Sequence, residues 1–175
     1  MVFRFLFLFI LGFLSVALQM GLVATWGQPF SLINITLIVA VLLFFFLKNR
    51  RDLFFLIIWV GFLAELFSSN FFGVHLLALL LTFFIITLIS SNFLTNKTLV
   101  VLLVLSFFVF IFYNLIFVFL NFLISIKYTV NVSYSFLDYL RFGLLEFLVN
   151  TPIILLMHFL IQKSSKFFRK IFIFI

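Results

Sequence analysis

The chain has no cysteine, and its 175 residues include only four acidic side chains and two histidines. The absence of cysteine excludes disulfides, thiolate metal sites and thiol catalysis. The acids and histidines are scattered along the chain, so we predict neither a metal site nor a cofactor. The sequence also shows no nucleophile–base pair, glycine-rich phosphate loop or metal-ligand spacing. These absences predict a protein that is not an enzyme.

Charge is equally scarce. Charged residues make up 9% of the chain and hydrophobic residues 67%, whereas a soluble domain is typically about 25% charged and about 45–50% apolar. A soluble fold of this size cannot hide so much apolar surface, so the lipid bilayer is predicted to be the solvent. The chain also has no polar stretch long enough for a soluble domain. Residues 1–175 are therefore predicted to form a single integral membrane domain.

Six apolar stretches have the length of membrane spans. A transmembrane helix needs about 20 apolar residues, with a range of about 17–25. The pattern predicts an all-α membrane protein with six transmembrane helices, at about 5–25, 30–47, 53–67, 74–89, 99–124 and 142–161. In the longest connection, the alternation from Tyr128 to Tyr134 favours a short strand.

The basic residues predict the orientation of these spans. With a cytoplasmic N-terminus, only Lys127 and Arg141 lie outside. The other nine lie on the cytoplasmic side: Arg4, Lys48, Arg50, Arg51, Lys97, Lys163, Lys166, Arg169 and Lys170. Cytoplasmic loops of membrane proteins carry the excess of Lys and Arg, so both termini are predicted to be cytoplasmic. The same distribution argues against nucleic acid as a partner.

Glu65 is the most informative single residue. It lies inside the third apolar stretch, a little past the expected midplane, and the polar residues Ser68 to Asn70 follow it. An ionisable group in hydrocarbon is a candidate functional residue, because it costs several kcal/mol by most estimates. Three interpretations stay open: a hydrogen bond that fixes helix packing, proton or ion coupling, and binding of a partner. Gly61, one turn earlier, would let another helix approach the same face closely.

Other polar side chains occur in the later spans. Asn114 lies in the fifth, and Glu146 and Asn150 lie one turn apart in the sixth, where Pro152 predicts a kink. Together with Glu65 they are candidates for one intramembrane polar seam. His75, at the outer boundary, is more simply a packing residue than a ligand.

Small residues mark a possible helix contact in the first span. Ala17, Gly21 and Thr25 recur every four residues, a spacing that permits close helix approach but also arises by chance.

Two local patterns resemble a known family. Gln28-Pro29-Phe30-Ser31-Leu32 resembles the proline-led start of the second helix of MreD, a small six-helix membrane protein of the bacterial cell-elongation machinery. Gly61-x-x-x-Glu65, followed by Phe72-Gly73-x-x-x-Leu77, resembles the glycine–acid–glycine pattern of that family across helices three and four. The family usually has aspartate where this chain has Glu65.

The resemblance implies a function and partners. It implies a non-enzymatic subunit of the rod complex in the bacterial cytoplasmic membrane, which supports cell shape and peptidoglycan synthesis. Its partner would be an MreC-like protein, and indirectly MreB, RodA and a class B penicillin-binding protein. Helix-packing and partner contacts would involve Gly61, Glu65, Gly73 and Pro29, with Ala17 and Gly21 as further candidates.

An alternative function follows from the implied fold, which is similar to the substrate-binding subunits of energy-coupling-factor vitamin transporters. Such a subunit would bind a vitamin in a pocket open to the outside, and pockets of this kind need several well-placed polar groups. The outer half of the chain offers Asn34, Glu65, His75, Asn114 and Glu146. A lipid-handling enzyme is a third class, for which the sequence suggests no set of residues.

Overall fold

The computed structural model describes residues 2–23, 30–47, 50–68, 71–93, 98–128 and 136–163, and in these residues every regular element is helical. The prediction of an all-α protein is thus confirmed for the described residues. Their six α-helices are α1 (Val2–Leu18), α2 (Ile35–Phe46), α3 (Arg50–Phe67), α4 (Val74–Phe93), α5 (Leu99–Tyr128) and α6 (Phe136–Lys163). A π-helical turn, η1 (Gln19–Val23), continues α1, and a 3₁₀ turn, η2 (Phe30–Leu32), precedes α2.

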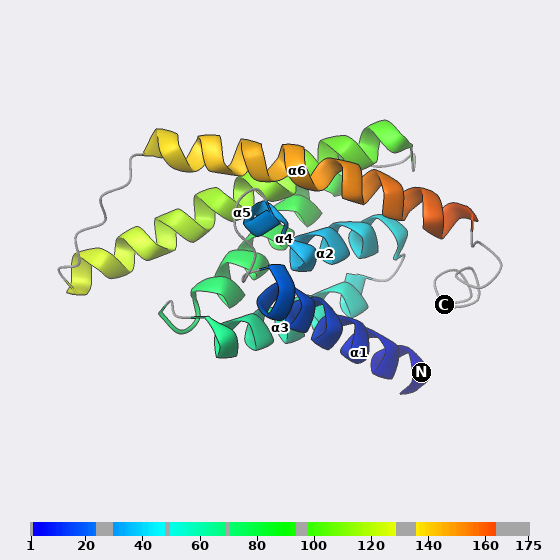
Figure 1. Cartoon of the computed structure of the whole chain (residues 1–175), viewed down its shortest axis with the longest axis horizontal. Coiled ribbons are helices and arrows are strands. Elements are labelled where there is room, and N and C mark those ends of the chain that lie inside the picture. Colours follow the sequence, from blue (N-terminus) through cyan, green and yellow to red (C-terminus); the bar gives the residue numbers. More distant parts are fainter. Residues whose placement is uncertain are drawn as a thin grey trace.

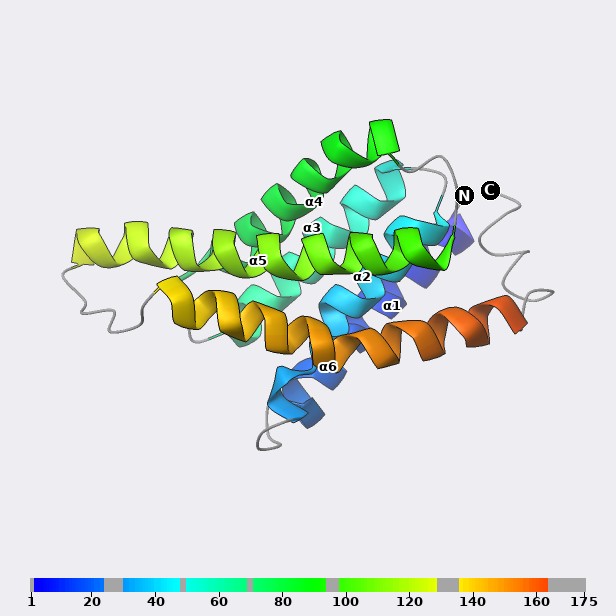
Figure 2. The same cartoon turned by 90° about the horizontal axis from the view of Figure 1, so that it is seen from above.

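Consecutive helices pack against each other as antiparallel hairpins. The most extensive neighbours are α3 with α4, α4 with α5, and α5 with α6, while α1 packs on α3 (Figure 1). The start of α1 and the end of α6 lie at one end of the molecule, and the end of α5 and the start of α6 lie at the other (Figure 2). Near its middle, where Pro152 lies, α6 bends, because proline cannot donate the helical hydrogen bond.

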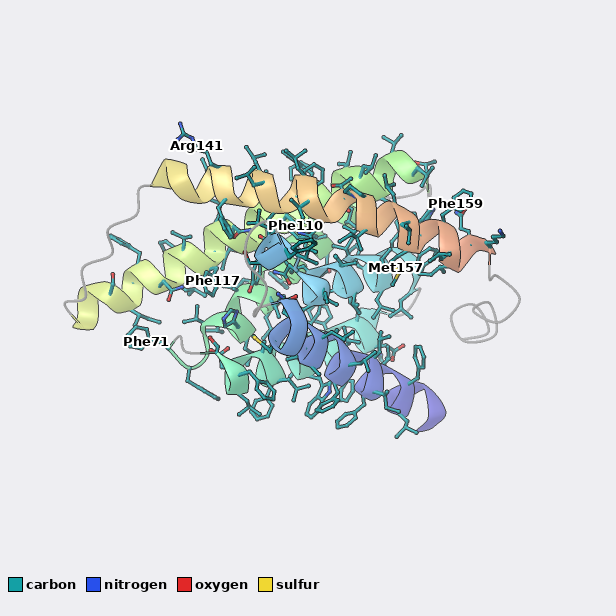
Figure 3. All side chains as sticks on the ribbon, in the orientation of Figure 1. Phe71, Phe110, Phe117, Arg141, Met157 and Phe159 are labelled. Carbon is teal, nitrogen blue, oxygen red and sulfur yellow. The ribbon has the colours of Figure 1, made fainter. Side chains whose placement is uncertain are left out.

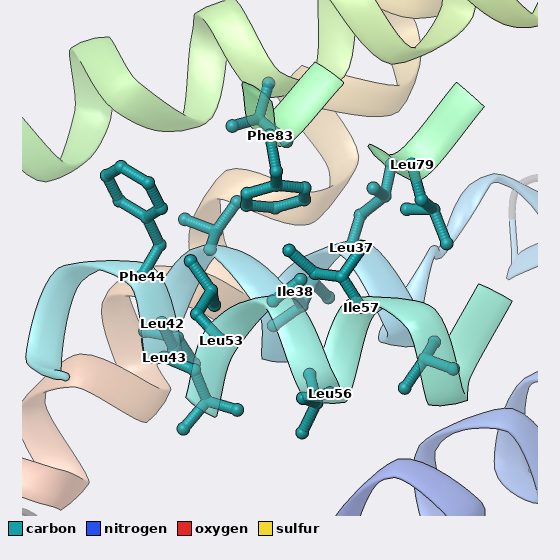
Figure 4. Packing of buried hydrophobic residues seen from close by; sticks show 14 of the residues in the cluster. Leu37, Ile38, Leu42, Leu43, Phe44, Leu53, Leu56, Ile57, Leu79 and Phe83 are labelled. Carbon is teal, nitrogen blue, oxygen red and sulfur yellow. The ribbon is translucent and has the colours of Figure 1, made fainter. Parts of the chain in front are cut away.

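The core is built around α2. Eight of its twelve residues are buried, on all sides of the helix: Leu37, Ile38, Ala40, Val41, Leu42, Leu43, Phe44 and Phe45. A helix that is apolar all round belongs in the interior, and α2 is in contact with α1, α3, α5 and α6. Figure 4 shows Leu53 and Ile57 of α3 and Leu79 and Phe83 of α4 packed against it.

The outer faces of the helices are apolar too. Exposed large side chains occur on every α-helix except α2, with Phe159 of α6 and Val100 of α5 each at 68% exposure, and Figure 3 shows Phe159 on the outer side of α6. Two helical stretches, Leu99–Ser125 and Leu140–Lys163, are long and apolar enough to cross a membrane. Shorter apolar helical stretches run over Leu6–Gly21, Phe30–Phe46 and Val74–Ile89.

The spans predicted at 5–25 and 30–47 are not single regular helices. The first changes from α- to π-helix after Leu18, and the second is broken at Ile33 and Asn34, between η2 and α2. With 12 residues, α2 is about 18 Å long at about 1.5 Å per residue. Hydropathy detects an apolar run but not a break in the helix within it, so both runs were predicted as single continuous helices.

Three later helices are longer than predicted. Helix α4 runs to Phe93, α5 runs to Tyr128 and α6 starts at Phe136, beyond the apolar stretches 74–89, 99–124 and 142–161. The predicted lengths followed the thickness of a bilayer, whereas helical hydrogen bonding continues as long as the backbone allows it. Tyr128, the first residue of the predicted strand, is helical, and the rest of that segment lies outside the described residues.

Helices α3 and α4 approach each other closely at Gly61. A Cβ atom added there would lie 2.8 Å from Cδ1 and 3.0 Å from Cα of Leu76. Both distances are shorter than an ordinary van der Waals contact, so the backbones can pack this closely only because residue 61 is a glycine. The face of Gly61 is therefore occupied within the chain by α4.

We expect Gly61→Leu to destabilise the α3–α4 hairpin, because overpacking a tight contact typically costs about 1–3 kcal/mol. The matched control is Gly21→Leu, since a Cβ at Gly21 would meet nothing within 4 Å. Thermal unfolding of the purified protein in one detergent measures the difference. Equal melting temperatures for the two variants would contradict the close approach.

Candidate functional site

The carboxylate of Glu65 caps the start of α4. Glu65 lies in the last turn of α3 and is only 5% exposed. Its Oε1 accepts from the backbone N–H of Gly73 at 2.7 Å, and its Oε2 accepts from the N–H of Leu76 at 3.1 Å. The first amides of a helix have no partner within that helix and carry its positive dipole end, so a carboxylate is favourable there. Glu65 thus lies two residues before the end of α3 at Phe67, where it can reach the first residues of α4.

Gly73 explains why this cap comes from another helix. Its carbonyl accepts the first helical bond of α4, from Leu77 at 2.9 Å, so Gly73 occupies the N-cap position. The residue at this position usually caps the helix with its own side chain, which glycine does not have. Its φ of 99° is also a conformation that favours glycine. The three residues Gly61, Glu65 and Gly73 thus act together. Gly61 permits the close approach of α4, Glu65 caps the start of α4, and Gly73 adopts the backbone conformation from which α4 begins.

A second polar group connects α3, α4 and α5. Nδ1 of His75 lies 3.0 Å from the hydroxyl oxygen of Tyr113, and Nε2 lies 3.0 Å from Oγ of Ser68. The imidazole also packs on the ring of Phe117, with centroids 4.8 Å apart. Sequence analysis named His75 and, in the polar turn after Glu65, Ser68, but it did not connect the two and it missed Tyr113.

A third polar group surrounds the break between η2 and α2. Oε1 of Gln19 accepts from the N–H of Ile35 at 2.7 Å, and its Nε2 donates to the carbonyl of Ile33 at 3.0 Å. The amide of Asn150 bonds two more backbone groups of this break. Its Oδ1 accepts from the N–H of Asn34 at 2.8 Å, and its Nδ2 donates to the carbonyl of Leu32 at 2.9 Å. Backbone groups that leave a helix in an apolar environment need such partners.

Glu146 links this break to α5 and α6. Its Oε1 accepts from Nδ2 of Asn34 at 2.8 Å, and its Oε2 accepts from Nδ2 of Asn114 at 2.5 Å. Asn34 also caps α2, because its Oδ1 accepts from the N–H of Leu37 at 3.2 Å. Glu146, Asn114 and Asn150 are all buried. We call the five side chains of Gln19, Asn34, Asn114, Glu146 and Asn150 the polar junction.

The structure brings together part of the predicted set. Asn114, Glu146 and Asn150 belong to the polar junction, whereas Glu65 accepts hydrogen bonds from Gly73 and Leu76 at the start of α4. Sequence analysis missed Gln19 and the role of Asn34, although a polar residue within each apolar run was a usable signal. Ala17 and Gly21 are exposed on the outer face, and Pro29 lies outside the described residues. Within the described ranges no group of acidic and histidine side chains is arranged to hold a metal ion.

Comparisons with protein-family models, with curated proteins and with solved structures find no match for this chain.

The cap predicts an order of effects at residue 65. Glu65→Gln keeps one acceptor oxygen, whereas Glu65→Leu removes both, and loss of a helix cap typically costs about 0.5–2 kcal/mol. We therefore expect the free energy of unfolding to fall modestly for Gln and more for Leu. Chemical unfolding followed by circular dichroism gives both values.

Asn121→Leu is the control, since the amide of Asn121 donates to the Phe117 carbonyl of its own helix. Wild-type stability in Glu65→Leu would refute the capping role. Equal loss of function in Gln and Leu variants that fold normally would instead point to the charge of Glu65.

Glu146→Gln tests the polar junction. Both oxygens of Glu146 accept from amide nitrogens, so the glutamine NH₂ group must face another donor. A buried donor without an acceptor costs about 1–3 kcal/mol, and we expect the break at residues 32–35 to open more often. Faster hydrogen exchange of the Asn34 and Ile35 amides, with unchanged exchange in α4, is the expected result. Uniformly unchanged exchange would contradict it.

Proposed function

We propose that this protein is a membrane subunit of the bacterial rod complex that acts through helix contacts. In this proposal all six helical segments cross the cytoplasmic membrane, with both termini in the cytoplasm. Support comes from the apolar outer faces of the helices and from the nine-to-two distribution of Lys and Arg between the two sides. Helix ends that meet the basic segments lie at the same end of the molecule (Figure 2).

The observation that carries the proposal is the joint role of Gly61, Glu65 and Gly73. These three residues carry the glycine–acid–glycine pattern, one of the two local patterns that resemble MreD. Here they form a single physical unit at the α3–α4 connection. Glutamate at the acid position bonds both Gly73 and Leu76, so the departure from the usual aspartate preserves a capping function.

The surface for an MreC-like partner is best placed on α1 and η1. Ala17 and Gly21 are exposed, and a side chain at Gly21 would point into open space. Small exposed residues let a second transmembrane helix approach closely. Leu76 of the same chain fills the space beside Gly61, so the Gly61 face does not offer a surface to a partner. Through its partner the protein would act with MreB, RodA and a class B penicillin-binding protein.

The vitamin-binding alternative receives less support. Its pocket would need the polar groups of the outer half to face a cavity. Instead, Asn34 and Asn114 both donate to the carboxylate of Glu146, and Glu65 accepts from the backbone at the start of α4.

We expect Gly21→Leu and Ala17→Leu to weaken co-purification with an MreC-like partner while the melting temperature stays unchanged, because bulk prevents close helix approach. Val104→Phe, on an exposed position of α5, is the matched control and should leave co-purification intact. Depletion of the protein should round rod-shaped cells. Normal cell shape after deletion, together with saturable vitamin binding by the purified protein, would overturn the proposal in favour of the transporter subunit.

A further inference from the structure

Ser68, His75 and Tyr113 have the geometry of an activated serine. A nucleophilic serine is recognised by a base within about 2.6–3.2 Å that is itself oriented by a third group. Here Oγ of Ser68 lies 3.0 Å from Nε2 of His75, and the opposite ring nitrogen lies 3.0 Å from the Tyr113 hydroxyl. The hydroxyl and the base come from positions 68 and 75, separated by the α3–α4 turn, so the fold has to bring them together.

The surroundings of His75 suit a base. Tyr113 is buried and Phe117 packs against the imidazole, so the ring is held from two sides. Glu65 bonds the amides of Gly73 and Leu76, which places a carboxylate in the same helical turn as His75. A nearby negative charge stabilises the imidazolium that forms when the base takes a proton.

The position of Ser68 defines the class of substrate. Ser68 is half-buried at the end of α3, beside exposed apolar side chains of the same connection: Leu66 at 57%, Phe67 at 59%, Phe71 at 42% and Phe72 at 74%. Figure 3 shows Phe71 and Phe117 at the same end of the molecule. A hydroxyl at the edge of an apolar surface meets amphiphiles, whose acyl chains contact the apolar side chains while the polar ester lies at the interface.

We propose that Ser68 is a nucleophile toward carboxylic esters of amphiphiles, with His75 as its general base and Tyr113 as the residue that positions His75. Oγ attacks the ester carbonyl carbon, and Nε2 of His75 takes the hydroxyl proton. The carbon–oxygen bond to the alcohol breaks, the alcohol leaves with that proton, and the acyl group stays on Ser68. His75 then takes a proton from a water molecule as the water oxygen attacks the acyl carbon. The bond from that carbon to Ser68 Oγ breaks, Oγ takes the proton back from His75, and the acid is released. This activity goes beyond the proposed assembly role, which does not require it.

An alkyl fluorophosphonate with a fluorophore tests the proposal on the full-length purified protein in detergent. Its phosphorus–fluorine bond breaks as a bond from phosphorus to Ser68 Oγ forms, so labelling reports the nucleophile directly. We expect one adduct per chain, located at Ser68 by peptide mass spectrometry. His75→Gln should slow labelling by about 10²-fold or more, the usual contribution of a general base, and Tyr113→Phe should slow it less.

Two controls keep the experiment decisive. Ser31→Ala removes an exposed hydroxyl elsewhere and should label like the wild type, and the melting temperature of Ser68→Ala should show that the fold is intact. Undiminished labelling of folded Ser68→Ala, or no labelling of wild type under conditions that label a known serine hydrolase, would overturn the proposal. Neither result bears on co-purification with an MreC-like partner, so the two proposals fail independently.

Discussion

Backbone amides and carbonyls that leave a helix inside an apolar bundle have no water to bond, and this constraint organises the polar side chains of the protein. It acts at two places. At the break between η2 and α2, Gln19 and Asn150 supply partners for four backbone groups of Leu32 to Ile35. At the start of α4, Glu65 supplies two acceptors for amides that Gly73 itself cannot cap. In hydrocarbon each of these groups would otherwise cost several kcal/mol.

The same bonds hold the helices together. Glu146 and Asn150 tie α6 to the segment before α2, Asn114 ties α5 to α6, and Glu65 ties α3 to α4. Hydrogen bonds between membrane helices are individually weak, about 0.6 kcal/mol on average, so several of them and the close contact at Gly61 act jointly. The two proposals rest on other features: the exposed Ala17–Gly21 face and the contact between the Ser68 hydroxyl and His75.

Much of the fold could be predicted because hydropathy is a local property. Each of the six predicted spans contains a helix, and Glu65, Asn114, Glu146 and Asn150 were recognised as unusual simply because they interrupt apolar runs. Helix ends and the break at Ile33–Asn34 were missed, because apolar residues continue across the break. The only local sign of this break is Asn34, because asparagine is a preferred N-cap residue. That preference alone does not predict a break, since the exposed backbone groups also need partners such as Asn150, which is distant in sequence. Tyr113 gave no signal, since hydroxyl groups are common in both loops and spans.

The sequence by itself determined the apolar, all-helical character of the chain and the approximate positions of its helices. These follow from composition and from periodicities within a single segment. Only the tertiary structure decided which polar groups meet, because Gln19, Asn34, Asn114, Glu146 and Asn150 come from four separate stretches of chain. It also decided that Gly61 serves α4 rather than a partner. Residues distant in sequence make contact only through packing of whole helices, and no local pattern encodes which faces will pack.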